Sequence, residues 1–147
     1  MAAVSLQQFA QIMQGAGKRL PNAVNTLIKG LAEDIDRGVI LETPVDVGTA
    51  RSNWVVSLTT PEGDFIQAYA PGDRLGKGER RNAFAAVIQG RGVIAARQPG
   101  QTIFIQNNAP YIGVLNNGYS RQSPALFVES AIMVAVRNLN GKELKVL

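Results

Sequence analysis

The stretch Thr43–Leu58, "TPVDVGTARSNWVVSL", decides the fold, because it lies between a helical pattern of apolar residues and a strand-like one. Pro44 ends the preceding helix, since the residue before a proline is disfavoured in the helical region. Asp46 can accept hydrogen bonds from nearby backbone N–H groups in an Asx-turn, and Gly48 can adopt a positive φ. Arg51 is close enough in sequence to pair with Asp46 or with a neighbouring helix end. The stretch therefore predicts a helix-to-strand joint and not a reactive loop.

Two helical segments are expected before this joint. Ser5 and Gln8 have the form of a capping box that opens the first segment, which the glycines at 15 and 17 interrupt. Because proline breaks or kinks a helix, residues 1–20 are expected to form a short helix or arm, continuous with the next helix only through a kink at Pro21. Asn22 can cap the second, longer helix. Its apolar stripe consists of Val24, Leu27, Ile28, Leu31, Ile35 and Val39.

A β-hairpin is expected after the joint. Trp54, Val56 and Leu58 recur with the period of two that is typical of a strand, and Trp54 is expected to anchor this strand in the core. Residues 61–64 have good turn chemistry, and Phe65–Tyr69 can return as the second strand.

Further along the chain, Gln101–Gln106 has strand character, and Tyr111–Leu115 fits a short strand or a helical turn. Ser123 can cap a C-terminal helix with Pro124 at its first position, and residues 141–147 would form a tail. These elements predict an α+β fold in which a long N-terminal helix and a C-terminal helix pack on a small, mostly antiparallel sheet. With 147 residues and no linker, residues 1–147 are expected to form a single domain.

Residues 71–100 are expected to form a flexible basic insertion between strands, whose second part, residues 82–97, could be a helix broken by Gly90 and Gly92. This segment holds six basic residues and two acidic ones, which accounts for the whole net charge of +4. A localised basic segment is a candidate surface for DNA or for an acidic protein partner. The residues that would face such a partner are Arg74, Lys77, Arg80, Arg81, Arg91 and Arg97.

The composition argues against an enzyme. The chain has no cysteine and no histidine, which excludes thiol nucleophiles, imidazole bases, disulfides and Cys/His zinc sites. The eleven acidic residues are scattered, and Glu33, Asp34 and Asp36 are expected on the solvated face of a helix. The glycine-rich stretch 72–78 departs from a P-loop in spacing and in the residue after its lysine. No catalytic residue, metal or cofactor is therefore expected.

Membrane association is not expected either, since no apolar run approaches the length of a bilayer span and the N-terminus lacks a signal-peptide pattern.

Two stretches together resemble a known family. "TPVDVGTARSNW" is similar to the "TPVDTG-x-x-R-x-x-W/I" signature of small neck and tail-completion proteins of tailed bacteriophages. About fifty residues later, that family has a pattern like "N-x-x-P-Y-x-x-x-L-E-x-G-x-S-x-Q-x-P", followed by a C-terminal helix. The resemblance covers most of residues 20–138. The matching residues include Thr43, Pro44, Asp46, Gly48, Arg51 and Trp54 in the first stretch and Asn107, Pro110, Tyr111, Leu115, Gly118, Ser120, Gln122 and Pro124 in the second.

One departure from this pattern matters for Arg51. Asn116 stands where the family usually has an acid, so an arginine that pairs with that acid in relatives would need another partner here. For Arg51, Asp46 is the expected substitute.

The resemblance implies a structural, non-catalytic virion protein. Such proteins form a ring, commonly hexameric, in the neck at the head–tail interface, where they complete the tail and join it to the connector. The implied partners are further copies of the chain, connector or stopper proteins, and tail-tube or terminator proteins. Genome DNA would pass through the lumen with non-specific contacts at most. The implied location is the virion, after assembly in the host cytoplasm.

Three alternatives stay open beside a neck adaptor. The chain can be a tail terminator that caps the tail tube, or a small DNA-binding protein without sequence specificity that uses its basic segment. A carboxylate-based hydrolase would instead hold a divalent ion between residues such as Asp34, Asp36 and Asp46.

Overall fold

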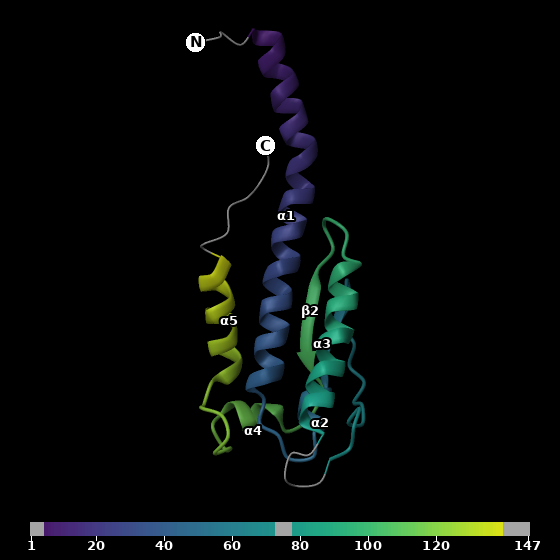
Figure 1. The fold of residues 1–147 in the computed structure, drawn as a ribbon, viewed down its shortest axis with the longest axis vertical. Coiled ribbons are helices and arrows are strands. Elements are labelled where there is room, and N and C mark those ends of the chain that lie inside the picture. The colour runs from purple at the N-terminus through teal and green to yellow at the C-terminus, as the bar shows by residue number, and fades with distance from the viewer. Residues whose placement is uncertain (1–4, 73–77, 140–147) are drawn as a thin grey trace.

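The computed structural model describes residues 5–72 and 78–139, and its axis is the helix α1, Leu6–Glu42 (Figure 1). The expected capping box is confirmed: Ser5 Oγ accepts a hydrogen bond from the Gln8 N–H at 3.1 Å, and Gln8 Oε1 accepts one from the Ser5 N–H at 2.9 Å. The helix ends where the sequence predicts, because Thr43 leaves the helical region directly before Pro44.

The expected separate short helix at residues 1–20 is wrong, because α1 runs through Pro21 as one helix of 37 residues. A proline removes one helical N–H and crowds the carbonyl four positions earlier. That position is Gly17, which is exposed and has open space around it. Water can therefore bond the carbonyl that Pro21 leaves without a donor, and the helix continues.

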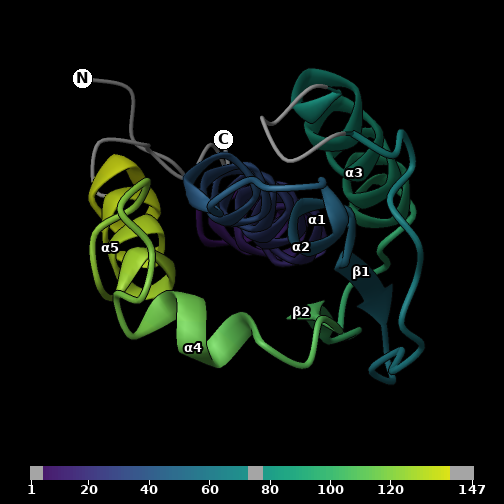
Figure 2. The same cartoon turned by 90° about the horizontal axis from the view of Figure 1, so that it is seen from below.

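Six shorter elements surround the C-terminal half of α1. Viewed along the axis of α1, α3 and α5 lie on opposite sides of it, and the strands lie beside α3 (Figure 2). The strands β1 and β2 pair antiparallel, with Trp54 opposite Asn107 and Leu58 opposite Ile103. The predicted α+β class is thereby confirmed. The elements are α2 (Thr49–Ser52), β1 (Trp54–Leu58), α3 (Glu79–Ala95), β2 (Ile103–Asn107), α4 (Ile112–Asn116) and α5 (Phe127–Leu139).

The predicted hairpin partner of β1 is wrong. Residues 61–68 form no strand, and the partner of β1 is β2, which follows α3 in the chain. Polar side chains form hydrogen bonds with the backbone of this extended segment instead. Asn53 donates to the Ile66 carbonyl at 2.7 Å and accepts from the Ile66 N–H at 2.9 Å. Asn82 bonds the N–H and the carbonyl of Ala70 in the same way, at 2.7 and 2.8 Å. These side-chain amides supply the hydrogen bonds that a neighbouring strand would otherwise make to the backbone of this segment.

The segment 71–100 does lie between the two strands, and its second part is a helix, as the sequence allows, but without the break expected at the two glycines. Residues 79–95 form α3, which continues through Gly90 and Gly92 and buries Ala83, Ala86 and Ile94. Gly90 permits a close approach to α1, since a Cβ here would lie 2.1 Å from Asp36 Oδ2. Gln89 bonds the N–H and the carbonyl of Val56, at 3.1 and 3.0 Å, so that a side chain of α3 takes the place of a further strand.

The core joins all three long helices to the sheet. Trp54 is 5% exposed and lies in this core, as the sequence predicts. Gly38 of α1 and Ala131 of α5 allow those helices to pack closely, because a Cβ at Gly38 would lie 3.1 Å from that of Ala131. The main cluster consists of Val39, Ile40, Trp54, Ala83, Ala86, Phe127 and Ala131.

The C-terminal helix begins later than predicted. Leu126 has a positive φ of 61°, so α5 starts at Phe127 and not at Pro124. Asn116 holds this start: its backbone carbonyl accepts from the Leu126 N–H at 2.6 Å, and its side-chain oxygen accepts from the Val128 N–H at 3.0 Å. The helical-turn alternative for residues 111–115 is correct, since α4 covers Ile112–Asn116. The predicted helix end at 140–141 and the tail lie outside the described residues.

Candidate functional site

The two motif stretches meet in space. Together they line a hollow of about 270 Å³ at the end of α1, with Pro44–Ala50 on one side and residues of the second stretch on the other. The second stretch contributes Tyr111, Leu115, Tyr119, Ser120 and Gln122. We call the two stretches, 43–54 and 107–124, the motif junction.

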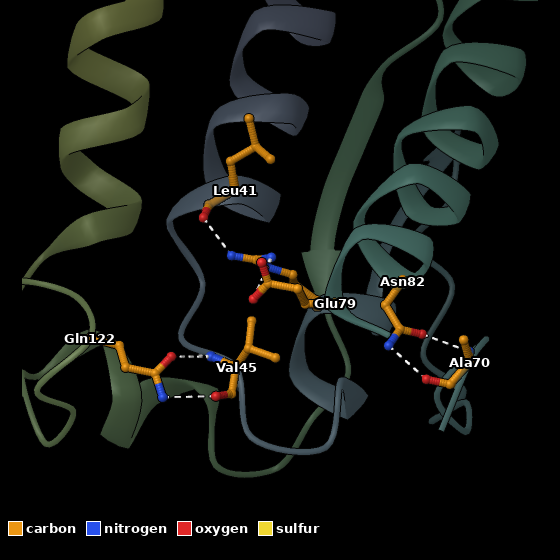
Figure 3. A network of polar contacts seen from close by, with 7 residues as sticks. Leu41, Val45, Ala70, Glu79, Asn82 and Gln122 are labelled. Atoms are coloured by element: carbon orange, nitrogen blue, oxygen red, sulfur yellow. Dashed lines mark hydrogen bonds and ion pairs between the residues drawn. The ribbon is translucent and has the colours of Figure 1, made fainter. Parts of the chain in front are cut away.

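Gln122 ties the two halves of the motif junction together (Figure 3). Its amide accepts from the Val45 N–H at 2.9 Å and donates to the Val45 carbonyl at 2.7 Å. Next to it, the Ser123 hydroxyl donates to the Glu42 carbonyl at the end of α1. The role of Ser123 is therefore to hold α1, and not to cap α5 as predicted.

Replacing Gln122 with alanine is expected to lower the free energy of unfolding by about 1–3 kcal/mol, because both backbone groups of Val45 lose their partner. Gln122→Glu should cost a similar amount, since a carboxylate cannot donate to the Val45 carbonyl. Urea unfolding followed by Trp54 fluorescence measures both. Val45 itself is buried, so an unchanged unfolding midpoint in both variants would contradict this role of Gln122.

Thr43 and Trp54 form buried hydrogen bonds at the joint between α1 and β1. The Trp54 Nε1–H donates to Thr43 Oγ1 at 2.7 Å, and the Thr43 hydroxyl donates to the Val39 carbonyl at 2.6 Å. The chain links the last turn of α1 to the first residue of β1. It fixes the position of the strand relative to the helix.

Gly48 has the positive φ that the sequence predicts, at 86°. It also lies against Asn82, whose Nδ2 would be 2.0 Å from a Cβ at this position. Asn82 is fully buried, and its Oδ1 accepts from the Ser52 hydroxyl at 3.0 Å in addition to its bonds to Ala70. The glycine is therefore required by its backbone conformation and by the packing of Asn82.

Arg51 does not pair with Asp46. Its guanidinium donates to the Leu41 carbonyl at 2.8 Å, near the end of α1, and lies 3.9 Å from Glu79 Oε2 in the first turn of α3 (Figure 3). Burial lowers the pKa of Arg51, and the charges of Glu79 and Glu42 act against that shift. The arginine thus joins two helix ends, which agrees with the alternative of a neighbouring helix end.

Asp46 forms no Asx-turn: it is exposed, and its side chain makes no hydrogen bond with the residues that the structure describes.

The remaining motif residues shape the second stretch. Tyr111 lines the hollow, and burial raises the pKa of its hydroxyl group. Gly118 has a φ of 92° and approaches Ala125, and Ser120 Oγ accepts from the Gln122 N–H at 3.2 Å. Pro110 and Pro124 are exposed.

The four basic candidates that the structure describes do not all lie on the surface. Arg80, Arg81 and Arg91 are exposed on α3, whereas Arg97 is buried. Arg97 donates to the Gln101 carbonyl at 2.9 Å and to Asn25 Oδ1, and so fastens the end of α3 to α1. Its assignment as a DNA- or partner-facing residue is therefore wrong. The other two candidates, Arg74 and Lys77, lie outside the described residues.

The acidic residues do not gather at a site. Asp36 is 2% exposed and lies against α3, not on a solvated helix face. Burial raises its pKa from 3.8 to about 7, and its Oδ1 is buried without a hydrogen-bond partner among the described residues. Over residues 5–72 and 78–139, no three acidic side chains lie close enough to hold a metal ion. In the same ranges, no helix combines the length and the hydropathy of a membrane span.

Three contacts of the motif junction and its surroundings are not evident from the sequence. Asn82, Gln89 and Asn116 each bond backbone groups of a distant segment. The one available signal is the placement of Asn82 and Gln89 among the apolar residues of α3. A polar side chain at a buried helical position often serves backbone that lacks a partner.

Comparisons with protein-family models, with curated proteins and with solved structures found no match to this chain.

Proposed function

We propose that the protein is a structural component of a tailed-bacteriophage virion, which forms a ring in the neck and joins the tail to the connector. A tail terminator that caps the tail tube is the nearest variant of this function, since it is also a ring. In either role the chain carries no catalytic site and its partners are proteins, with DNA passing through the lumen.

The observation that supports the proposal is the contact between the two motif stretches. They resemble two separate parts of one family pattern, and their residues bond one another directly through Gln122 and Val45 and through Asn107 and Ala50. Two chance matches to the family pattern would not be expected to contact each other in the fold. Their contacts are between backbone groups and neutral side chains, as a joint that fixes geometry requires.

The surface of the chain supports an assembled state. Large apolar side chains are exposed on the N-terminal part of α1 and on α5, among them Leu6, Phe9, Met13, Ile132 and Met133. Contiguous exposed apolar patches mark protein interfaces, and a subunit of a closed ring needs two of them.

The DNA-binding alternative rests on the exposed arginines of α3. It predicts tight duplex binding by the protein alone, with a steep dependence on salt. Arg80→Ala together with Arg81→Ala should then weaken binding and reduce the salt dependence. Loss of assembly in this variant, with unchanged DNA affinity, would assign these residues to a protein contact.

The proposal is tested in particles assembled with and without the protein. Without it, filled heads and separate tails are expected to accumulate, and adding the purified protein should restore joined particles. Particles that join heads to tails equally well without the protein would refute the proposal. Tails of uncontrolled length would favour the terminator variant.

A further inference from the structure

The N-terminal part of α1 projects beyond the other elements (Figure 1). We call residues 6–24 the arm. Leu6 is 85% exposed, Phe9 54% and Met13 55%, and Leu20 and Val24 are exposed as well. The first side chain of α1 with a hydrogen bond to another part of the described chain is Asn25, which pairs with Arg97. The arm therefore shows an apolar face that the described part of its own chain leaves uncovered.

The apolar face of the arm has the spacing of a helix–helix seam. Leu6, Met13 and Leu20 are seven residues apart, and Phe9 and Ala16 follow three residues after the first two of them. Apolar residues at the first and fourth positions of a heptad form the narrow stripe along which two helices pack. This pattern favours another helix as the occupant over a small ligand.

The arm is also a poor helix in isolation. Gly15 and Gly17 each cost about 1 kcal/mol relative to alanine, and Pro21 costs about 3 kcal/mol. Most helices in proteins are stabilised by packing of an apolar face and not by intrinsic propensity. Packing of its apolar face against another helix would offset this intrinsic cost.

The same face of α1, followed along the helix, is the one that α5 covers. Gly38 lies two heptads after Val24 and packs against Ala131 of α5. With its 13 residues, α5 is about 20 Å long, and it lies beside the C-terminal half of α1, so that α5 of the same chain does not reach the arm (Figure 1). The apolar face of the arm is thus a continuation of the face of α1 that packs against α5, but α5 of the same chain does not cover it.

A second copy of the chain offers the missing helix. The outer face of α5 carries Ile132, Met133 and Val136, which are exposed and lie at helical spacing. Met133 is 57% exposed. We propose that the arm of one copy packs along this outer face of α5 in a second copy. The contact joins two different surfaces, so that it repeats from subunit to subunit and can close a ring. The inference names the interface of the proposed ring and rests on that proposal.

Cysteine cross-linking tests the contact directly, because the natural chain has no cysteine. One variant carries Phe9→Cys on the arm and another carries Met133→Cys on α5. Mixed and oxidised, they are expected to give a disulfide between the two variants at several times the yield of either variant alone. A disulfide requires Cα atoms within about 7 Å, so the product reports direct packing.

The matched control is Gln11→Cys, an exposed residue on the opposite side of the arm. Its yield with Met133→Cys should stay at the level of random collisions. An equal yield for Phe9→Cys and Gln11→Cys, or no product at all, would overturn the proposal. A product of Phe9→Cys with itself as the main species would also overturn it, because it would show two arms paired with each other.

A pair of charge variants separates this inference from the proposed function. Met13→Glu with Leu20→Glu should abolish oligomers in light scattering, whereas Gln7→Glu with Gln11→Glu, on the other side of the helix, should leave them intact. Rings that persist in the first variant would refute the arm interface and leave the neck function standing. Arm cross-links in a protein that never forms a ring would refute the neck function instead.

Discussion

Replacing Asp36 with asparagine is expected to make the protein more stable at pH 8 by about 2–4 kcal/mol, with little change at pH 4. The reason is the burial of this carboxyl group between α1 and α3. Burial raises its pKa from 3.8 to about 7. Asparagine has nearly the same shape and no charge, so it avoids the cost of an ionised group in the core.

The direction of the pH dependence follows from proton binding. Between pH 3.8 and 7 the folded protein retains the Asp36 proton while the unfolded chain releases it. Stability therefore falls as the pH rises through this window, by up to about 1.4 kcal/mol for each pH unit, and this contribution levels off above pH 7.

Urea unfolding of the natural protein and of Asp36→Asn at a series of pH values measures the effect. The difference between the two should grow from pH 4 to pH 7 and then stay constant. A variant that is less stable than the natural protein by the same amount at every pH would contradict a protonated, unpartnered Asp36. It would indicate that the carboxyl group makes a specific bond in the folded state.

Replacing Gly48 with alanine is expected to lower the free energy of unfolding by about 2–5 kcal/mol. A left-handed backbone costs an alanine about 1–2 kcal/mol, and overpacking in a core adds about 1–3 kcal/mol. Both apply here, since φ is 86° and the new Cβ would lie 2.0 Å from Asn82 Nδ2. Moving Asn82 would also disturb its bonds to Ser52 and Ala70.

Gly100→Ala is the matched control. Gly100 has a φ of 90°, but a Cβ there would meet nothing within 4 Å. The free energy of unfolding of Gly100→Ala should fall only by the cost of the left-handed backbone, about 1–2 kcal/mol. Thermal unfolding of both variants isolates the contribution of the contact with Asn82, and equal losses would show that Asn82 moves aside without cost.

The sequence was sufficient for elements that depend on local chemistry. The capping box at Ser5, the end of α1 before Pro44, and the strand character of residues 54–58 follow from neighbouring residues and were predicted correctly. The interruption at Pro21 was not, because its cost depends on whether the carbonyl that loses its donor can bond water instead. Here that carbonyl belongs to an exposed glycine.

Pairings between distant segments could not be read from the sequence. The strand β1 pairs with residues 103–107 and not with the nearer segment 65–69, where the Asn53 amide bonds the backbone of Ile66. The Asn82 amide bonds the next residue, Ala70, in the same way. Asp36 and Arg97 are charged, and charged residues are seldom buried, so both were assigned to the surface. Their burial depends on Gly90 and on Asn25, which lie 54 and 72 residues away in the sequence.

The sequence predicted which residues belong to the motif junction, but not which of them contact one another. The residues of both stretches were identified, and they meet around one hollow. A neighbouring helix end was among the expected partners of Arg51, but Glu79 was not, since it belongs to a helix whose position depends on the whole core.

Electron microscopy of the purified protein tests the central claim most directly. The account predicts closed rings with a single subunit number and a central opening wide enough for duplex DNA, about 20 Å. It also predicts that Met13→Glu with Leu20→Glu removes these rings while the subunit stays folded. A homogeneous population of folded monomers at the concentrations at which virion proteins assemble would contradict the account.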